Sequence, residues 1–521
     1  MNTAKLPAQQ RAVQLVGPDQ LTLNAAKPVH APNDYQIVGR IEVTGLCFSD
    51  LKLLKQFSGH VRKSDVLTGV DRTVLPDIPS YVPNEKPVVP GHETVVRIVQ
   101  VGSKVKSVQV GDRRLVQTDY RWLKTANSNA AFGYNFEGAL QEYVLMDERV
   151  ITSPDGESML LPASEGLAAS AIALVEPWAC VEDSYVVRER QSPKPGGKTM
   201  TIGGPGFDPA TLDQVPDESL DDIVFLGADA ALLEKAFTKI AKNGLVNIVQ
   251  GGATFGRPVN TPVGRVHYGN VRITGTTGSD PAAGYAAIPA TGEIRPHDRI
   301  NVVGAGGPMG SMHVIRDLCQ GVPGVSVLGG DMSDERLAAL AKVAAPLAQK
   351  NGVAFSTYNA KTNPPAGSFG YIALMVPVPA LVEAAIQQAA SRAVINIFAG
   401  IPATVWHPLS LDAYVAKQAY FIGTSGSDLN DMKIVLQKVE SRALDTNLSV
   451  AAVSGLEGAV DGIRAVEKQL IPGKILVYPS CRGLGLTPLT ELAGKHPEVA
   501  ALLTDGAWNV QAERKLIELY R

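Results

Sequence analysis

The chain has 521 residues, of which 45% are hydrophobic and 19% are charged, and its formal net charge is −3. This length predicts about three domains at roughly 100–200 residues each. The small net charge argues against a nucleic-acid-binding or acidic-membrane-binding protein. The four cysteines lie far apart without CxxC spacing, which favours a reducing cytoplasm over a disulfide framework. The N-terminal stretch carries no apolar run of the signal-peptide type, and residues 371–382, the longest apolar run, are too short to span a bilayer.

Taken in chain order, the sequence pattern changes twice. Residues 11–150 contain many short β runs punctuated by Gly and Pro, which predicts an antiparallel barrel or sandwich. Residues 164–190 look helical, and from about 195 to 441 strands and helices alternate, which predicts parallel α/β units. Residues 471–479 then predict one more strand, and 488–521 predict short polar helices.

The α/β region contains an internal repeat. Residues 221–251 match 370–400 at an offset of 149, and ITGTTGSD (273–280) matches FIGTSGSD (421–428). Chance likeness between α/β units explains the repeated GT-x-GSD poorly, so the sequence predicts a duplication. The second copy is preceded by an additional helix, strand, helix and strand, whereas the first copy follows its glycine-rich leader almost at once. We therefore expect the first copy to lack the half of a nucleotide fold that holds a dinucleotide.

Residues 300–331 have the parts of a dinucleotide site: an apolar strand, a glycine-rich turn, a helix and a second strand that ends at Asp331. The expected cofactor-binding residues of the turn are Gly304, Gly306, Gly307, Pro308, Met309 and Gly310. Small residues let the backbone approach a pyrophosphate, and the helix N-terminus attracts its negative charge. Asp331 can accept hydrogen bonds from ribose hydroxyls and would repel a 2′-phosphate, which favours NAD over NADP. Arg336 either moderates this preference or pairs nearby.

Three further segments carry chemistry together: GLCFSDLK (45–52), PGHE (90–93) and VEPWA (175–179). In this order they resemble the zinc-dependent medium-chain dehydrogenase/reductase family, most closely its polyol branch of sorbitol-dehydrogenase type, with sorbose-1-phosphate reductases as a close variant. The resemblance implies an α/β plus β fold, in which a GroES-like catalytic β-barrel domain accompanies a Rossmann dinucleotide domain. Here an additional degenerate, duplicated half-Rossmann domain would be added.

The resemblance also implies roles for single residues. Cys47 and His92 would be zinc ligands, Glu93 a third ligand or a supporting group, and Glu176 a direct or water-mediated ligand. Ser49 would receive the substrate proton, Asp50 would orient His92, and Lys52 stands where the family has the histidine that ends the proton relay. Taken singly, these residues also have ordinary explanations as a core cysteine, a turn histidine or a helix cap. Cys180, one helical turn past Glu176, is a weaker ligand candidate. Residues 93–150 contain no cysteine, so one catalytic zinc and no structural zinc are expected.

These patterns predict domain boundaries. They are a catalytic domain at 1–190, the degenerate copy at 191–295, the NAD-binding domain at 296–440, a return to the catalytic domain at 441–480 and a helical extension at 481–521. Residues 56–86 lengthen the usual gap between Cys47 and His92. The basic residues of this segment, Arg62, Lys63 and Arg72, either meet a substrate phosphate or are solvated loop charges.

The expected function is hydride transfer between NAD(H) and a secondary alcohol or ketone of a polyol, sugar or sugar phosphate. The alternatives are an L-threonine-type amino-alcohol dehydrogenase and a non-catalytic binding or scaffold protein derived from the family. The expected partner is a small molecule, without nucleic acid or membrane. A homo-oligomer is possible, but we expect residues 272–278 to pair with 420–426 inside one chain, so that the first copy replaces a partner subunit. The competing role for that copy is a substrate-recognition or regulatory insert.

Overall fold

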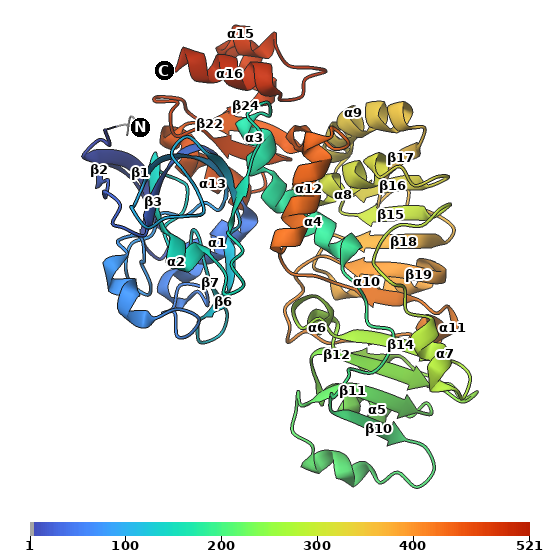
Figure 1. Cartoon of the computed structure of the whole chain (residues 1–521). Helices are drawn as coiled ribbons and strands as arrows, with labels where there is room; N and C mark the ends of the chain where they lie inside the picture. The colour runs from blue at the N-terminus through green and yellow to red at the C-terminus, as the bar shows by residue number, and fades with distance from the viewer. Residues whose placement is uncertain (1–4, 521) are drawn as a thin grey trace. The chain divides into compact units, whose positions relative to one another are not determined.

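The chain divides into two compact units in the computed structural model, which describes residues 5–520 (Figure 1). One unit takes the residues up to Ala179 and those from Asp428 onward, and the other is Cys180–Ser427. Residues 1–4 and 521, which fall in the predicted N-terminal stretch, catalytic domain and helical extension, lie outside the described residues. The units change at residues 179–180 and 427–428, compared with predicted boundaries at 190 and 440, and the predicted boundaries at 295 and 480 fall inside a unit.

The first unit is built around an eight-stranded sheet in the order β24-β22-β23-β3-β4-β5-β9, with β8 paired to β3. Only β22 and β23 are parallel within it. Its strands, together with those of two small sheets, are β1 (Gln9–Gly17), β2 (Gln20–Pro28), β3 (Gln36–Gly45), β4 (Glu93–Val101), β5 (Arg113–Val116), β6 (Asp119–Lys124), β7 (Asn129–Ala131), β8 (Tyr143–Asp147), β9 (Leu160–Pro162), β22 (Val450–Ser454), β23 (Lys474–Val477) and β24 (Thr487–Pro488). The antiparallel strands of the barrel or sandwich predicted for residues 11–150 are therefore present, and β23 lies in the predicted strand 471–479.

The end of β3 is a junction between three strands of this sheet. Gly45, the last residue of β3, lies opposite Glu93 of β4 on one side and opposite Leu476 of β23 on the other. It therefore brings together the beginnings of two strands that are far apart in sequence. Every residue of β23 is buried, Lys474 included, because the strand lies inside the sheet.

Short helices complete the first unit. They are α1 (Phe48–Gln56), η1 (Phe57–Gly59), η2 (Arg72–Asp77), α2 (Glu148–Ile151), α3 (Ala169–Ala173), α12 (Leu429–Glu440), η4 (Thr446–Ser449), η5 (Leu456–Gly458), α13 (Ala459–Glu467), η6 (Leu489–Glu491), α14 (Leu492–Lys495), α15 (Pro497–Ala500) and α16 (Val510–Leu519). The C-terminal extension is attached through Glu513 of α16, whose buried carboxylate accepts the backbone N–H groups of Ala169 and Ser170 at the start of α3. This bond satisfies donors that a helix start otherwise leaves unpaired.

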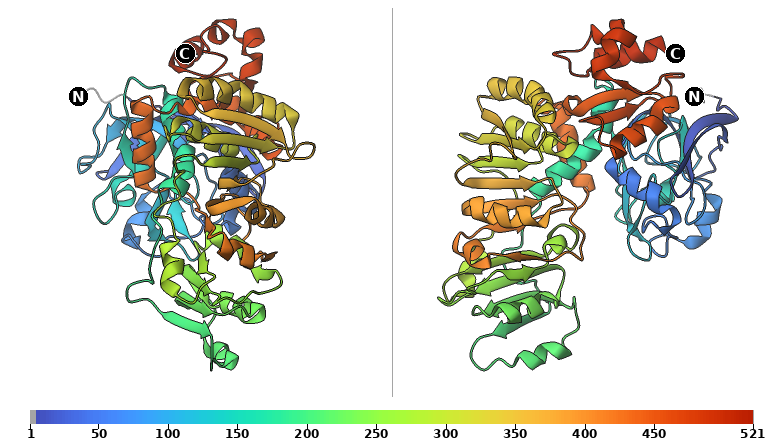
Figure 2. Two further views of the ribbon diagram at one scale, coloured as in Figure 1. Left: turned by 90° about the vertical axis from the view of Figure 1, so that its right-hand side faces the viewer. Right: turned by 180° about the vertical axis from the view of Figure 1, so that it is seen from behind.

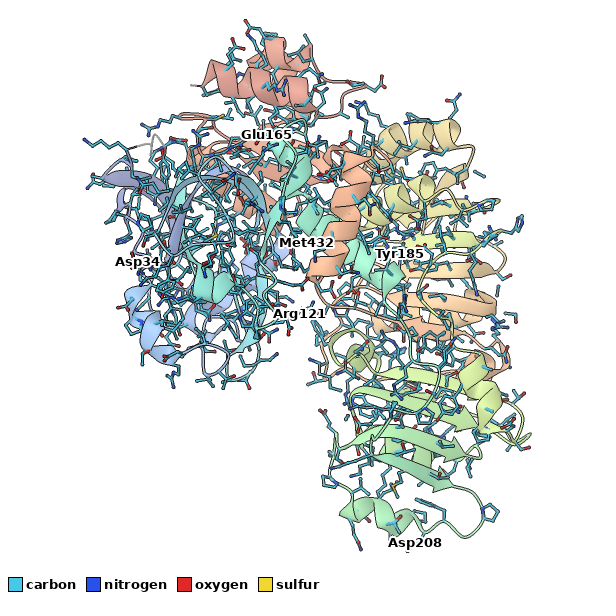
Figure 3. The ribbon with its side chains drawn as sticks, viewed as in Figure 1. Asp34, Arg121, Glu165, Tyr185, Asp208 and Met432 are labelled. Atoms are coloured by element: carbon cyan, nitrogen blue, oxygen red, sulfur yellow. The ribbon has the colours of Figure 1, made fainter. Side chains whose placement is uncertain are left out.

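The helical prediction for 164–190 resolves into α3 and α4 (Val175–Val186), and α4 continues into the second unit. There Glu182 forms a buried ion pair with Arg316 of α8 (Pro308–Cys319), and the Tyr185 hydroxyl lies 2.7 Å from His313 Nδ1 (Figure 3). The Arg316 guanidinium lies over the Tyr185 ring, 3.7 Å from its centroid. These contacts fix the C-terminal half of α4 against the first helix of the nucleotide fold.

The second unit contains two fully parallel sheets, which follow one another in the ribbon views (Figures 1 and 2). The six-stranded sheet has the order β17-β16-β15-β18-β19-β21, which is the 3-2-1-4-5-6 order of dinucleotide-binding folds. The other has the order β10-β11-β12-β14. The elements are β10 (Thr199–Gly203), η3 (Pro209–Gln214), β11 (Leu220–Leu226), α5 (Ala230–Phe237), β12 (Ile240–Val249), β13 (Val259–Thr261), α6 (Val263–Tyr268), β14 (Arg272–Thr276), α7 (Pro281–Ala286), β15 (Arg299–Val303), α8, β16 (Ser326–Asp331), α9 (Asp334–Asn351), β17 (Ala354–Asn359), β18 (Phe369–Leu374), α10 (Pro379–Gln388), β19 (Ala389–Ile397), β20 (His407–Leu409), α11 (Leu411–Ala416) and β21 (Tyr420–Ile422).

The two sheets repeat small irregularities as well as strand order. The pairing of β11 with β12 shifts register between Leu220 and Asp222, and the pairing of β18 with β19 shifts between Phe369 and Tyr371, the equivalent positions. Two left-handed residues also recur, Asn243 (φ 62°) at the position of Arg392 (φ 58°) and Asn270 (φ 51°) at that of Gln418 (φ 50°). Such backbone details are expected when one chain path is traced twice. The four-stranded copy has no equivalents of β16 and β17.

No helix in the described part of the chain is both long enough and apolar enough to cross a membrane.

Candidate metal and dinucleotide sites

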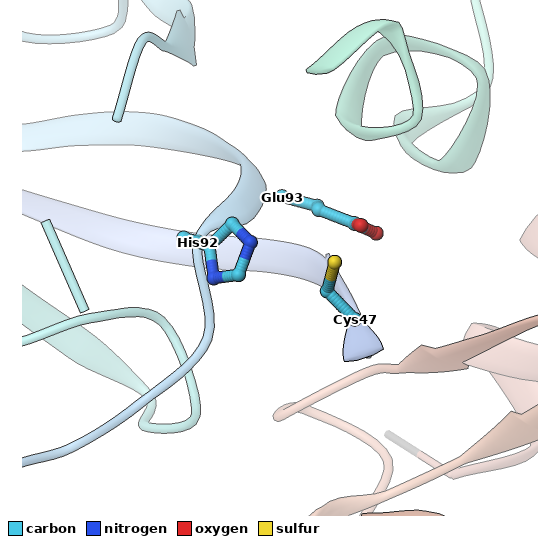
Figure 4. A group of neighbouring side chains, drawn as sticks. All are labelled: Cys47, His92 and Glu93. Atoms are coloured by element: carbon cyan, nitrogen blue, oxygen red, sulfur yellow. The ribbon is translucent and has the colours of Figure 1, made fainter. Parts of the chain in front are cut away.

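Three side chains with different donor atoms converge in the first unit (Figure 4). Cys47 is the residue that precedes α1, His92 comes just before β4, and Glu93 is its first residue. The thiol sulfur, an imidazole nitrogen and a carboxylate oxygen all lie within 4.8 Å of one another. His92 and Glu93 are buried, and Cys47 is half-buried. Sulfur, nitrogen and oxygen donors at this separation can share one metal ion, and the mixture suits zinc.

Asp50 orders two of the three donors. One carboxylate oxygen accepts the backbone N–H of Cys47 at 3.1 Å, and the other lies 3.1 Å from His92 Nδ1. A histidine held at Nδ1 by a carboxylate presents its Nε2 lone pair in a fixed direction. Burial by itself would lower the pKa of His92, but Asp50, with help from Tyr134 and Cys47, raises this pKa well above its usual value. The orienting role of Asp50 stays a prediction.

Glu93 has one paired and one unpaired oxygen. Its Oε1 binds the buried ammonium of Lys474, which also donates to the Leu46 carbonyl oxygen at 2.8 Å. Its Oε2 is buried and has no hydrogen-bond partner among the described residues. Buried polar atoms are nearly always satisfied, so an unpaired carboxylate oxygen beside a thiol and an imidazole is the position a metal would fill. Gly45 is needed here, because a Cβ at this position would collide with Glu93 Oε2.

Glu176 lies in the first turn of α4, close to the same group. Burial raises the pKa of Glu176 to about 7, and the neighbouring Glu93 adds to the effect while His92 opposes it. The sequence left open whether Glu93 or Glu176 is the third donor. The compact group of donors contains Glu93, and neither Glu176 nor Cys180 belongs to it.

Ser49 and Tyr134 face the same donors. The Ser49 hydroxyl lies 3.1 Å from His92 Nε2 and 3.1 Å from Cys47 Sγ, and it lowers the pKa of the buried Tyr134, which burial raises. The Tyr134 ring lies 5.8 Å from the His92 ring and 5.1 Å from that of His60, which belongs to the inserted segment 56–86. Lys52 lies one helical turn beyond Ser49 on α1, and its charge acts on His60.

The side chains of Arg62, Lys63 and Arg72 in the inserted segment lie in different surroundings. Arg62 lies over the Tyr134 ring, 5.7 Å from its centroid, and 3.5 Å from the Asp119 carboxylate. Arg72 is exposed. Lys63 contradicts both sequence-based interpretations, because its side chain is buried and its ammonium donates to the carbonyl oxygens of Val82 and Lys86. It holds the loop together from inside and is shielded from solvent.

The glycine-rich turn of the second unit joins β15 to α8. Gly304 has a positive φ of 85°, Gly307 caps the helix, and a Cβ at Gly310 would collide with the Gly304 carbonyl oxygen. Pro308 and Met309 begin α8, where unpaired N–H groups collect. Asp331, the last residue of β16, accepts the Gly306 N–H at 3.1 Å, so the acid predicted to bind ribose lies against the turn. The Arg336 backbone N–H donates to the Ser333 hydroxyl that caps α9.

Sequence reasoning did not identify two residues beside Cys47, His92 and Glu93, namely Lys474 and Tyr134. Lys474 lies within an apolar strand, and a lysine at such a position needs a buried carboxylate partner, which was the available signal. The sequence does not say which carboxylate, since Glu93 is hundreds of residues away. Tyr134 follows β7 in a Gly-rich turn, and nothing in its flanking residues distinguishes it.

Comparisons with known proteins identify the type of the N-terminal domain and the fold. Residues 33–155 match the alcohol dehydrogenase GroES-like domain. The chain is 28% identical over 246 residues to the uncharacterized protein YggP of Escherichia coli, covering 43% of this chain and 57% of that one. It is 30% identical over 154 residues to L-sorbose 1-phosphate reductase of Klebsiella pneumoniae, covering 29% and 36%. The chain therefore spans less than two thirds of the length of either relative.

The matched domain and the characterised relatives are those of alcohol and polyol dehydrogenases. Solved structures agree on the fold. The 2R,3R-butanediol dehydrogenase of Bacillus subtilis is similar at a TM-score of 0.53 with 14% identity, covering 90% of this chain and all of that one. The L-idonate 5-dehydrogenase of Escherichia coli is similar at 0.51 with 10% identity, covering 90% and 98%. The chain combines a GroES-like domain with a sheet that has the strand order of dinucleotide-binding folds.

Proposed function

We propose that this chain belongs to the medium-chain dehydrogenase/reductase family and is a zinc-dependent oxidoreductase that transfers a hydride between NAD(H) and the secondary alcohol or ketone of a polyol, sugar or sugar phosphate. The observation that carries the proposal is the group of Cys47, His92 and Glu93, in which a buried carboxylate oxygen has no partner among the described residues. A buried acceptor without a partner lowers the stability of a fold by about 1–3 kcal/mol. A purely structural role therefore does not explain why Glu93 Oε2 is buried without one.

The donor set fits one catalytic zinc. Cys47, His92 and Glu93 would hold the ion, and three protein ligands leave the fourth position of a tetrahedral site open. Zinc supplies a Lewis acid that lowers the pKa of an alcohol oxygen. Asp50 fixes the tautomer of His92, and Lys474 offsets the charge of Glu93 through the oxygen that does not face the ion. Glu176, a second carboxylate close to Cys47, His92 and Glu93, could serve as a further ligand.

The remaining residues handle the substrate proton. Ser49 is within hydrogen-bond reach of the donor group, so its hydroxyl can take the alcohol proton as the hydride leaves. We propose the buried Tyr134, whose pKa the Ser49 hydroxyl affects, as the next group of the relay. Lys52 stands where relatives have the terminal histidine of the relay, and we propose it as the solvent-side end, since its side chain is exposed.

NAD is the proposed dinucleotide. The turn at 304–310 is closed to side chains at Gly304 and Gly310, as a backbone cradle for pyrophosphate requires, and Asp331 stands where a 2′-phosphate would be repelled. The first copy of the repeat is proposed to be degenerate and to bind none. Its own glycines lead into η3, a 3₁₀ helix of 6 residues capped by Asp208, which lies beyond β10 at the outer end of the sheet (Figure 3).

A phosphorylated sugar is the preferred substrate class among those proposed. The similarity to L-sorbose 1-phosphate reductase supports it, and so does Arg62, the basic residue of the inserted segment that lies beside Tyr134. Arg62→Gln should raise KM for a ketose phosphate at least tenfold while leaving KM for the unphosphorylated ketose unchanged. Arg72→Gln, in the same segment but exposed, is the matched control. Equal effects of both variants would remove Arg62 from the substrate site.

The central experiment measures metal content and activity together. We expect about one zinc per chain by elemental analysis, NADH oxidation with a member of a panel of ketoses, ketose phosphates and amino ketones, and loss of both zinc and activity in Cys47→Ser. Cys319→Ser, a half-buried cysteine at the end of α8, is the control that should keep both. Full activity of metal-free protein would contradict the proposal, and activity confined to amino alcohols would replace its substrate class.

A further inference from the structure

The two copies of the repeat meet at equivalent positions. β13 and β20 are the same strand of the two copies, and they pair with each other antiparallel. Asn260 lies opposite Pro408, and these two residues occupy the same place in the repeat at an offset of 148. On either side the partners exchange, Val259 with Leu409 and Thr261 with His407. In a twofold, isologous interface each contact between two residues is repeated by their equivalents with the two copies exchanged. The pairing of β13 with β20 has this pattern.

A second pair of equivalent strands lies beside the first. β14 and β21, the last strands of the two sheets, are in contact. The direct ladder predicted between 272–278 and 420–426 is wrong, because β14 pairs only with β12 and β21 only with β19. The Tyr414 hydroxyl stands between them: it donates to the Ile273 carbonyl oxygen at 2.7 Å and accepts the Phe421 N–H at 3.0 Å. Ile273 and Phe421 are again equivalent positions.

A third equivalent pair is joined by a single carboxylate. Arg272 and Tyr420 open the two strands, and both donate to Oε2 of Glu189, at 2.9 Å and 2.7 Å. All three side chains are buried or nearly so. The approximate twofold axis therefore runs past Asn260–Pro408, Ile273–Phe421 and Arg272–Tyr420, with one core of buried apolar residues drawn from both copies around it.

The two sides of this interface have become different. Gly264 of α6 donates its N–H to the Val405 carbonyl oxygen, and a Cβ there would collide with the Pro402 carbonyl. The equivalent residue of α11 is Asp412, whose carboxylate accepts the N–H groups of Phe255 and Gly256. Two second copies could not meet in this way, because each would set Asp412 against a backbone that tolerates only glycine. The contact therefore allows a first copy to pair with a second copy and prevents two second copies from pairing.

We infer that the first copy, residues 191–295, is a built-in partner that joins the nucleotide fold in an internal dimer with approximate twofold symmetry. The apolar face that two separate chains would bury between them is covered within one chain. An exposed last strand is a ready template for another chain, and β14 with α6 covers the last strand of the six-stranded sheet. The first copy is thereby a structural partner and needs no ligand of its own.

Engineered cysteines test this inference in the full chain. Opposed residues of antiparallel strands have Cα atoms about 4.5–5.5 Å apart, within disulfide range. After mild oxidation, Asn260→Cys/Pro408→Cys should form a disulfide within one chain, seen as a monomer on a non-reducing gel and as a linked peptide pair by mass spectrometry. The yield should not change with protein concentration. The native chain, oxidised in parallel, reports the background of its four cysteines.

The single variants decide between internal and external pairing. If second copies paired between chains, Pro408→Cys alone would face itself across the twofold axis and give a disulfide-linked dimer. We expect no dimer above background from Pro408→Cys or Asn260→Cys. A dimer from either, an interchain link in the double variant, or no link at all would overturn the inference. None of these readouts depends on zinc, NAD or catalysis, so they stand apart from the proposed activity.

Discussion

The buried ion pair between Lys474 and Glu93 gives the sharpest test of the metal group. Lys474 is 5% exposed and Glu93 is fully buried. Lys474→Met keeps the length of the side chain and removes the ammonium, which leaves Glu93 without its cation and the Leu46 carbonyl oxygen without a donor. Removing one member of a buried ion pair costs about 3–5 kcal/mol. We expect the variant to lower the free energy of unfolding of the metal-free protein by about this amount.

The assay is denaturant unfolding of metal-free protein, followed by the fluorescence of Trp178 and Trp508, which are buried in the unit that holds the pair. Metal must be absent because binding to the folded state would shift the apparent stability. The matched control is the double variant Lys474→Met/Glu93→Leu. Replacing both partners by apolar groups of similar shape can be nearly neutral, so it should recover most of the loss, with a coupling of about 2 kcal/mol or more in the double-mutant cycle.

The refuting result is specific. If Lys474→Met costs less than about 1 kcal/mol and the coupling is near zero, the ammonium does not pair with Glu93 in the folded protein. The remaining carboxylate oxygen would then be free to bond elsewhere, and its assignment to a metal would lose its physical basis.

Three further changes probe other parts of the chain. Burial, with help from nearby cationic side chains, lowers the pKa of His60 to about 4. Between pH 4 and 6.5 the unfolded state therefore binds a proton that the folded state does not, and the free energy of unfolding rises with pH across that window by about 3 kcal/mol. In His60→Gln this part of the pH dependence should vanish, and an unchanged slope in denaturant titrations would contradict the reasoning. Tyr414→Phe leaves a buried N–H and a buried C=O unpaired at about 1–3 kcal/mol each, so hydrogen exchange of the β14 and β21 amides should quicken, whereas native-like protection would show that the hydroxyl does not bridge the strands. Gly45→Ala places a Cβ against the Glu93 carboxylate, so zinc affinity should fall by about 10–100-fold. The control is Gly494→Ala, where the added Cβ meets open space. Equal zinc content in titrations of the two variants would show that the Cβ at residue 45 does not displace the Glu93 carboxylate.

Much of the fold can be predicted from local pattern. The strand–turn–helix–strand sequence at 300–331 forms β15, α8 and β16 because a glycine turn between an apolar strand and an amphipathic helix has few other conformations. The repeat offset anticipated two similar sheets, and the missing half of the first copy corresponds to the missing equivalents of β16 and β17. Cys47, His92 and Glu93 were named from two short motifs, and the structure places their donor atoms within 4.8 Å of one another.

Other features depended on contacts between distant segments. The sequence could not choose between Glu93 and Glu176, because the choice rests on how β3, β4 and β23 share the position of Gly45. It also misjudged Lys63, since a basic loop residue is usually solvated and only the folded loop supplies two carbonyl oxygens for a buried ammonium.

The contrast has one physical reason. Periodicity, glycine turns and short motifs are local signals, so the sequence alone predicted the types of the strands and helices, a dinucleotide turn, a repeated segment and a set of donor atoms. The charge that neutralises Glu93, the hydroxyl that separates β14 from β21 and the glycine that admits one partner over another are set by pairs of residues more than a hundred positions apart. Only the tertiary structure decides such pairs, because their energies come from burial and from the absence of competing water.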